Sequence, residues 1–283
     1  MLFRSAEVRH IRIIVNDADI RVARSIDREW WGCLRNRVII QHRSKLFPIP
    51  SRFTRGWITQ QLCKLIGAAE SKSDWVMILD AKTWFIRAVS EKLFFQDGRA
   101  IIRIMPPNNR FDTGRQVLEQ EHQVDLAHAI GPLGVPYWFN SNIVRDLIAQ
   151  HDDFFDYFTT VADHPTFVTE FLLYYCQVVK SGLLDELYLD QHRWAPWHVG
   201  EGDEGTFDRA FARLQSPRHN YYIITSSIHR NCFGKLSDDQ LQKWVTFLHQ
   251  REVIPDPQEL LDLIAHYRET PLVRAVQIGR AHV

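Results

Sequence analysis

The sequence lacks several features that would assign a protein to a class at once. Its four cysteines are far apart and form no CxxC pair, so the sequence indicates neither a zinc cluster nor a secreted disulfide scaffold. No stretch reaches the roughly 18 uninterrupted apolar residues of a membrane-spanning helix. The opening residues, MLFRSAEVRH, also lack the apolar core of a signal peptide. We therefore expect a cytoplasmic protein without a transmembrane segment.

An excess of charge of one sign is also missing. Thirty-four Lys and Arg residues balance 34 Asp and Glu residues, and the sequence has no basic stripe. We therefore expect no nucleic-acid partner, and an anionic ligand must be held by local groups. The acidic stretch GEGDEG at residues 200–205 lacks the lysine and the spacing of a Walker phosphate loop, which argues against nucleoside triphosphate hydrolysis.

Apolar residues, in contrast, are abundant. The 283 residues are 45% hydrophobic and 12% aromatic, which is enough for a large core. Two β-branched runs, residues 11–15 and 37–41, flank a helical pattern and predict a βαβ opening. The continuous apolar run at residues 75–79 predicts a central parallel strand that is covered on both faces. Residues 100–105 predict another strand.

Helical spacing of apolar residues predicts a helix over residues 56–69 and dominates after residue 110. Beyond an indole-rich loop at residues 190–205, we expect a strand at residues 221–225 and then two helices. A capping box of Ser237 and Gln240 begins the first of these helices. Together the patterns predict an α/β fold with a Rossmann-like mixed or parallel sheet flanked by helices.

We expect a single domain over residues 1–277. The last six residues, IGRAHV at 278–283, resemble the translation of a common sequencing adapter, so we expect them to be a non-native tail.

Polar residues follow two of the predicted strands, where ligands of open α/β sheets bind. Asp80 comes directly after the apolar run, where it could accept hydrogen bonds from a ribose or coordinate a cation. Asn16, Asp17 and Asp19 follow the first strand. The alternative for all of them is that they cap or shape a turn.

Glu170 lies within an apolar helical stretch, TFVTEFLLYYC. A carboxylate with so many apolar neighbours is paired, protonated or functional. A helix-surface glutamate with an ordinary partner is the alternative, and Asp163 is a weaker candidate for the same role.

The segment GWITQQLCKLIGAAESKSDWVMILDAKTWFIR, residues 56–87, resembles the central segment of a bacterial glycosyltransferase-like family of formerly unknown function with a GT-A type core. Shorter similar segments extend the resemblance over about residues 10 to 250. The elements that carry it are a Gly-aromatic pair, a double Gln, a Leu-Lys helix and a strand that ends in Leu-Asp. They correspond to Gly56, Trp57, Gln60, Gln61, Lys64, Leu79 and Asp80.

The resemblance implies transfer of a sugar from a nucleotide-sugar donor to a glycan or other hydroxyl acceptor, in bacterial surface-polysaccharide synthesis. It places the donor-binding half at about residues 10–110 and the acceptor side with C-terminal helical additions at about 111–277. The alternative is a catalytically inactive protein of the same type that binds sugar nucleotides or glycans. A nucleotidyltransferase would need a Gly-rich, basic N-terminal loop, which the sequence lacks.

The implied donor-binding residues lie at the strand ends and on the helix between them. They are Asn16, Asp17, Arg55, Gln60, Gln61 and Asp80. GT-A enzymes usually carry Asp-x-Asp at this strand end to hold Mn²⁺ or Mg²⁺, but this sequence has Asp80-Ala81-Lys82. The lysine weakens the case for a metal and could itself neutralise the departing diphosphate. A solvated loop lysine is the alternative.

The resemblance also implies three catalytic groups, Glu170, Lys82 and His229. Glu170 would serve as the base of an inverting transfer or as an acid near the anomeric carbon of a retaining one. His229 follows a strand, where a late histidine meets the diphosphate or, with Asp80, a metal; Arg230 is its companion. A structural role is the alternative for this histidine.

The loop of residues 190–205 is rich in indole and imidazole groups. Trp194, Trp197 and His198, with His192, could bind the acceptor, because indole faces stack on sugars and imidazoles bond hydroxyls. The loop could equally pack back on the core.

Overall fold

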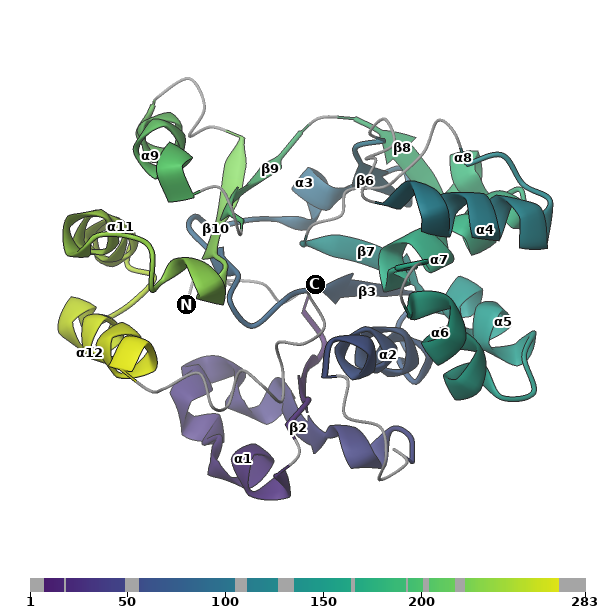
Figure 1. Ribbon diagram of the computed structural model, residues 1–283, viewed down its shortest axis with the longest axis horizontal. Helices are drawn as coiled ribbons and strands as arrows, with labels where there is room; N and C mark the ends of the chain where they lie inside the picture. The colour runs from purple at the N-terminus through teal and green to yellow at the C-terminus, as the bar shows by residue number, and fades with distance from the viewer. Residues whose placement is uncertain are drawn as a thin grey trace.

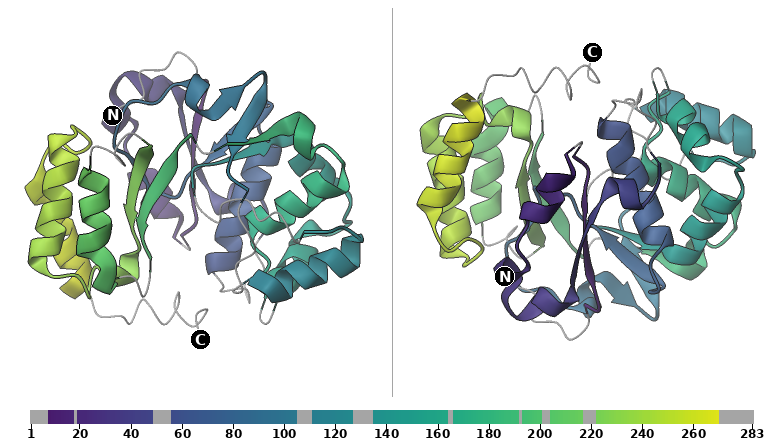
Figure 2. Two further views of the ribbon diagram at one scale, coloured as in Figure 1. Left: turned by 90° about the horizontal axis from the view of Figure 1, so that it is seen from above. Right: turned by 90° about the horizontal axis from the view of Figure 1, so that it is seen from below.

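The computed structural model describes residues 8–17, 19–48, 56–104, 111–126, 135–163, 166–191, 193–200, 204–216 and 222–269. It is a mixed α/β fold, as the sequence predicts (Figure 1). The strands run through the middle of the molecule (Figure 2). Helices α9, α11 and α12 lie on one side of them, and α2 and α4 to α7 lie on the other.

The strands are short. Their bounds are β1 Ile11–Val15, β2 Val38–His42, β3 Trp75–Ile78, β4 Trp84–Phe85, β5 Phe95–Gln96, β6 Arg99–Ile102, β7 Tyr137–Asn140, β8 Tyr188–Asp190, β9 Ala195–Val199 and β10 Ile223–Ile228. Within the described ranges they pair in four small sheets, with the orders β1-β2, β3-β7, β5-β6-β8 and β4-β10-β9.

Most of the described residues outside the strands are helical. The bounds of the α-helices are α1 Ile20–Ser25, α2 Gly56–Ala69, α3 Glu91–Phe94, α4 Asp112–His122, α5 Ser141–Ala149, α6 Phe154–Ala162, α7 Glu170–Lys180, α8 Leu184–Leu187, α9 Phe207–Gln215, α11 Asp238–Gln250 and α12 Pro257–Glu269. Short 3-10 helices cover Arg28–Arg37, Arg43–Lys45, Glu204–Thr206 and Arg230–Cys232. None of the described helices is long and apolar enough to span a membrane.

The predicted βαβ opening is confirmed. Strands β1 and β2 pair in parallel, with Ile11 opposite Val38, and α1 lies between them in the chain. Strand β2 begins one residue later than predicted, at Val38. A parallel pair needs such a crossover because its two strands run in the same direction.

The parallel neighbours expected for the strand at residues 75–79 are not observed. Strand β3 pairs antiparallel with β7, with Trp75 opposite Asn140, and Leu79 after it is 36% exposed. Trp75, Val76 and Met77 are only partly buried, so the complete cover expected on both faces is not observed either. The apolar run carries no information about the direction of the neighbouring strand.

The loop predicted at residues 190–205 contains a strand. Strand β9 pairs in parallel with β10, and β10 also pairs antiparallel with β4. Pro196 weakens the strand prediction for this segment, but an edge strand tolerates proline, and β9 lies at the edge of its sheet.

Side-chain caps fix where several helices begin. Asn140, Asp153 and Thr169 each accept a hydrogen bond from the first turn of α5, α6 and α7. At α11 the predicted capping box is confirmed, since Ser237 and Gln240 exchange both hydrogen bonds. Each cap satisfies an N–H group that the helix itself leaves unpaired.

The hydrophobic core has two large clusters. One joins α2, β3, α4, β7 and α5 to α7, and it includes Ile78. The other joins β9, β10, α9, α11 and α12, and it includes Ile86. Residues 79–83 connect β3 to β4, so Asp80 lies on the chain segment that passes from one cluster to the other. The N–H group of Thr83 donates to the carbonyl of Asp80 at 2.9 Å, which makes this segment a tight turn.

Gly114 provides a test of the packing between α4 and the segment before α7. A Cβ atom at Gly114 would lie 2.5 Å from the Thr166 carbonyl oxygen, which is rigid backbone. We therefore expect Gly114→Ala to lower the free energy of unfolding by about 1–3 kcal/mol. Urea denaturation measures the change.

Gly56→Ala is the matched control, because a Cβ atom at Gly56 would meet no described atom within 4 Å. We expect its stability to stay within about 0.5 kcal/mol of wild type. Equal stability of the two variants would contradict the close approach at Gly114.

Candidate functional site

The site is built around the ammonium group of Lys64. Its Nζ atom lies 2.8 Å from Asp80 Oδ1 and donates a hydrogen bond of 2.7 Å to Glu170 Oε1. The Lys64 ammonium also lies 5.0 Å from the centre of the Phe171 ring, a distance suited to a cation–π contact. One cation thus joins the end of β3 to the start of α7.

Three elements position these groups. Lys64 is on α2, Asp80 follows β3 by two residues, and Glu170 is the first residue of α7. A carboxylate at a helix N-terminus also interacts favourably with the helix dipole. Glu170 is buried, as its apolar neighbours in the sequence suggested, and its side chain is 4% exposed.

Gln61 supports the same helix start from α2. Its Oε1 atom accepts a hydrogen bond of 2.9 Å from the Glu170 N–H group, which α7 itself leaves unpaired. Its Nε2 atom is buried and has no hydrogen-bond partner within the described part of the chain. Gln60, the other half of the double Gln, is exposed. The structure therefore separates the two glutamines that the resemblance assigned together to donor binding, because Gln61 is buried and Gln60 is exposed.

Burial and charge act in opposite directions on Lys64 and Asp80. Burial lowers the pKa of Lys64, but the charges of Glu170 and Asp80 outweigh it, so this pKa lies above its ordinary value. Burial raises the pKa of Asp80, but the ammonium of Lys64 and then that of Lys82 outweigh it, so this pKa lies below its ordinary value. Both groups stay charged at neutral pH.

Lys82 forms the outer edge of the cluster. Its Nζ atom lies 3.6 Å from Asp80 Oδ2, and its side chain is 39% exposed, compared with 19% for Asp80. Asp80 Oδ1 is buried on the side of Lys64. A ligand that approaches from solvent therefore meets Asp80 through its other oxygen, beside the Lys82 ammonium.

The donor set does not fit a divalent metal. The two carboxylates, Asp80 and Glu170, both face the Lys64 ammonium, and a positive charge already occupies the space between them. The described residues also contain no group of three or more His, Cys, Asp or Glu side chains that could hold an ion. Mn²⁺ and Mg²⁺ need several free oxygen ligands, which two carboxylates already paired with an ammonium do not supply.

The polar residues after β1 are engaged in local structure. Asn16 donates to the Gly56 carbonyl at 2.7 Å and accepts from Arg43 and Thr59, so it ties the end of β1 to the start of α2.

Asp17 and Asp19 shape the next turn. Asp17 accepts from the Asp19 N–H group, and Asp19 caps α1 and pairs with Arg21. These contacts match the turn alternative. The predicted donor-binding residue Arg55 lies outside the described residues.

His229 lies at the carboxyl end of β10, in a different sheet from β3. Its N–H group donates to the Val199 carbonyl at 2.8 Å, and its ring Nδ1 accepts from the Asn231 N–H group at 3.3 Å. These contacts hold the turn after β10. The structure thus joins Asp80 and Glu170 through Lys64, with Lys82 beside Asp80, and the contacts of His229 given above, within the described part of the chain, do not reach this cluster. The side chain of Arg230 lies outside the description.

The two indoles predicted to bind the acceptor are buried. Trp194 packs edge-on against Phe94. Trp197 packs edge-on against Phe207 and Phe211, whose rings stack on each other, and its indole N–H group donates to the Ala210 carbonyl. Their exposed fractions are 7% and 5%. An indole buried in this way cannot stack on a sugar, so packing on the core is the arrangement observed.

The imidazole of His198 differs from the indoles. It is exposed on β9, and its Nδ1 atom lies 2.8 Å from Ser227 Oγ. The predicted acceptor residue His192 lies outside the described residues, and Asp163 ends α6, where its carbonyl accepts from Thr166.

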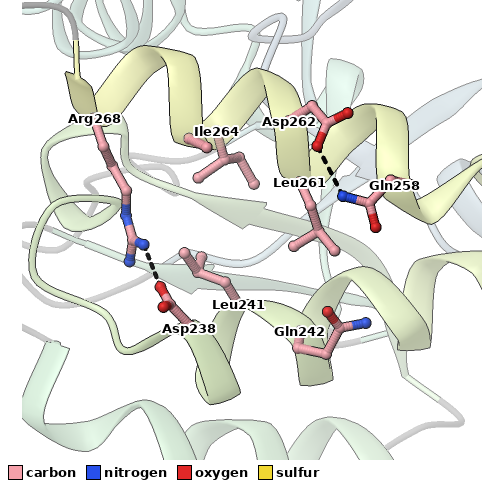
Figure 3. A pocket seen from close by; sticks show the side chains of 9 residues that line it. Asp238, Leu241, Gln242, Gln258, Leu261, Asp262, Ile264 and Arg268 are labelled. Atoms are coloured by element: carbon pink, nitrogen blue, oxygen red, sulfur yellow. Dashed lines mark hydrogen bonds and ion pairs between the residues drawn. The ribbon is translucent and has the colours of Figure 1, made fainter.

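A cavity of about 400 Å³ lies between α11 and α12 (Figure 3). Leu241, Leu261 and Ile264 form its apolar part. Its polar rim is paired internally, since Arg268 bonds Asp238 and Gln258 bonds Asp262. The predicted site residues are not among those that line it, so this cavity belongs to the packing of the two helices.

Lys64 is the site residue that sequence reasoning missed. It belongs to the Leu-Lys element of the resemblance, but it was not among the expected site residues. Its burial depends on Asp80 and Glu170, which are far from it in the chain, so the spacing of apolar residues within the helix carries no signal for it.

The site belongs to a mixed α/β protein with a charged cluster at the end of a strand. The chain is a member of a family of unknown function, DUF6492, whose sequence model matches residues 2–199. The matched region contains Lys64, Asp80, Lys82 and Glu170, and it ends before β10, α11 and α12. No curated protein matches the sequence.

Replacement of Lys64 tests the ion cluster. Lys64→Met leaves Asp80 and Glu170 close together without the cation between them. We expect the free energy of unfolding to fall by about 3–5 kcal/mol, because breaking a buried ion pair leaves an uncompensated charge. Chemical denaturation at neutral pH measures this loss.

Lys243→Met is the matched control. Lys243 pairs with Asp239 at 2.6 Å on the surface, where both side chains are well exposed. We expect this change to cost less than about 1 kcal/mol. A similar loss of unfolding free energy in the two variants would show that the Lys64 cluster stabilises the fold no more than a surface ion pair does.

The pH dependence of stability tests Asp80. Because its folded-state pKa is lowered, its contribution is complete above the unfolded-state pKa of about 3.9 and is lost as pH falls through the folded-state value. The stability advantage of wild type over Asp80→Asn should therefore be constant from about pH 7 to 5 and should shrink below about pH 4. Urea denaturation at each pH measures both proteins, and an advantage that grows on acidification would contradict the ion pair.

Proposed function

We propose that this protein transfers a sugar from a nucleotide-sugar donor to a hydroxyl acceptor, on a core of the GT-A type. The observation that supports it best is the pair formed by Asp80 and Lys82 at the carboxyl end of β3. A carboxylate oxygen and an ammonium group 3.6 Å apart face solvent there, with Lys64 and Glu170 behind them. This pair matches a ligand that carries hydroxyl groups next to a diphosphate.

Asp80 binds the hydroxyl side of the donor in this proposal. Its lowered pKa keeps the carboxylate ionised, so it accepts hydrogen bonds from a ribose or sugar hydroxyl and does not donate. The same property makes it a weak base at neutral pH. Asp80 therefore orients the donor.

Lys82 acts on the leaving group. When the bond between the sugar and the diphosphate breaks, its electron pair remains on a phosphate oxygen, and negative charge grows there. An ammonium on a flexible, 39% exposed side chain can move to that oxygen and stabilise the charge. The acceptor hydroxyl oxygen, or a water oxygen in its absence, forms the new bond to the anomeric carbon, and its proton passes to solvent water.

Glu170 has a supporting role in this scheme. Its side chain is 4% exposed and is held by Lys64, so an acceptor does not reach it without displacing that lysine. We assign it to fixing Lys64 and, through Lys64, the orientation of Asp80. This differs from the direct role in proton transfer that the resemblance implies.

A second function is favoured by one specific observation. Lys82 stands where an acidic residue would hold a metal, and a protein of this type without turnover would still bind sugar nucleotides through Asp80 and Lys82. Binding without donor hydrolysis separates this alternative from the transferase.

Donor binding and hydrolysis test the proposal. Thermal shifts with UDP-, GDP-, CMP- and dTDP-sugars identify the donor, and slow hydrolysis of that donor reports turnover. We expect Asp80→Asn to weaken donor binding and Lys82→Ala to slow hydrolysis by about 10²-fold or more, because each removes one charged contact to the donor.

Lys72→Ala is the control for the loss of a lysine. Lys72 is exposed and precedes β3, at the opposite end of the strand from Lys82. We expect it to bind and hydrolyse the donor as wild type does. The proposal fails if no sugar nucleotide binds, or if Asp80→Asn and Lys82→Ala behave like Lys72→Ala.

A further inference from the structure

The Lys64 ammonium is placed as a metal ion would be. It lies within 2.7 and 2.8 Å of oxygens from two carboxylates that come from different elements, Asp80 after β3 and Glu170 on α7. The lysine side chain is 14% exposed, so solvent contributes little to balancing these charges. The charge of Lys64 is therefore balanced mainly by the two carboxylates, and their charges mainly by Lys64.

A divalent ion and Lys64 cannot use these acids together. Mg²⁺ binds carboxylate oxygens at about 2.0–2.1 Å and demands a near-octahedral set of oxygens. The ammonium lies on the sides of Asp80 and Glu170 that face each other, and it would repel a second cation at that position. With Lys82 included, two ammonium groups balance two carboxylates.

We infer that Lys64 is a built-in cation that takes the place of a divalent metal at this site, and that it is the positioning residue for Asp80. The inference concerns the charge balance of the cluster, so it holds whether the bound ligand is a sugar nucleotide or another anion with hydroxyl groups. It differs from the role of Lys82, which faces the ligand.

The surroundings of Lys64 fit this role. The Phe171 ring, 5.0 Å from the ammonium, provides a further face suited to a cation. The Gln61 side chain, three residues before Lys64 on α2, holds the N–H group of Glu170 and so fixes the acid that binds Lys64. The cation is therefore held on several sides by groups that are themselves fixed.

Removal of the Lys64 ammonium should change which cations the cluster binds. If Lys64 is replaced by a small neutral residue, Asp80 and Glu170 face a vacated space that suits a divalent ion. Lys64→Ala should therefore gain a metal site that the wild-type protein does not have.

The experiment is a titration with Mn²⁺ that uses no donor or acceptor. We expect the Tm of Lys64→Ala to rise as the Mn²⁺ concentration increases, because an ion that binds only the folded state stabilises it. The wild-type Tm should not rise in this way. The double variant Lys64→Ala/Asp80→Asn is the matched control, and it should lose the shift because one of the two carboxylates is gone.

A second measurement keeps the inference testable if Lys64→Ala fails to fold. Electron paramagnetic resonance measures Mn²⁺ bound to wild type and to Asp80→Asn, and we expect the two proteins to bind equally. Mn²⁺ binding by wild type that Asp80→Asn abolishes would overturn the inference. A folded Lys64→Ala without any Mn²⁺ shift would also overturn it.

These outcomes are separate from those of the donor experiment. Absence of sugar-nucleotide binding would end the proposed function and leave the result with Mn²⁺ unchanged. Metal binding at Asp80 in wild type would remove the built-in cation but would not by itself exclude sugar transfer.

Discussion

The contact on which the rest of the site depends is the one between the Lys64 ammonium and two carboxylates, the buried Glu170 and the partly buried Asp80. It joins α2, the end of β3 and the start of α7, and Lys64 is 106 residues from Glu170 in the chain. Removing charges from water is costly, and only close pairing offsets that cost. Packing of α2, β3 and α7 is therefore most stable in the arrangement that brings these three charges into contact.

The cluster also divides its charges between the interior and the surface. Exposure of the side chains rises from 4% at Glu170 and 14% at Lys64 to 19% at Asp80 and 39% at Lys82. The inner pair is protected from solvent and keeps a fixed geometry, whereas the outer pair remains accessible. A ligand thus meets a carboxylate and an ammonium that are already oriented, which lowers the entropy cost of binding.

The ends of β1 and β3 show how similar residues come to serve different purposes. Asn16 after β1 uses its side chain to bind Gly56 and Thr59, and so it holds α2 in place. Asp80 after β3 also contacts α2, through Lys64, but it keeps part of its carboxylate open to solvent. The position at a strand end is the same in both cases. The neighbours that the folded chain places around the polar group decide whether all its hydrogen-bonding atoms are bonded within the protein or some remain open to a ligand.

The amino-acid sequence by itself determined the local features: the helix at residues 56–69, the βαβ opening, the capping box at Ser237 and the place of Asp80 after an apolar run. These depend on neighbours a few residues away, so a pattern can report them. Only the tertiary structure decided the antiparallel pairing of β3 with β7, the burial of the indoles at Trp194 and Trp197, and the partners of Lys64. Each of these depends on groups far apart in the chain, and the free energy that selects them comes from burial and charge pairing that exist only after the chain has folded.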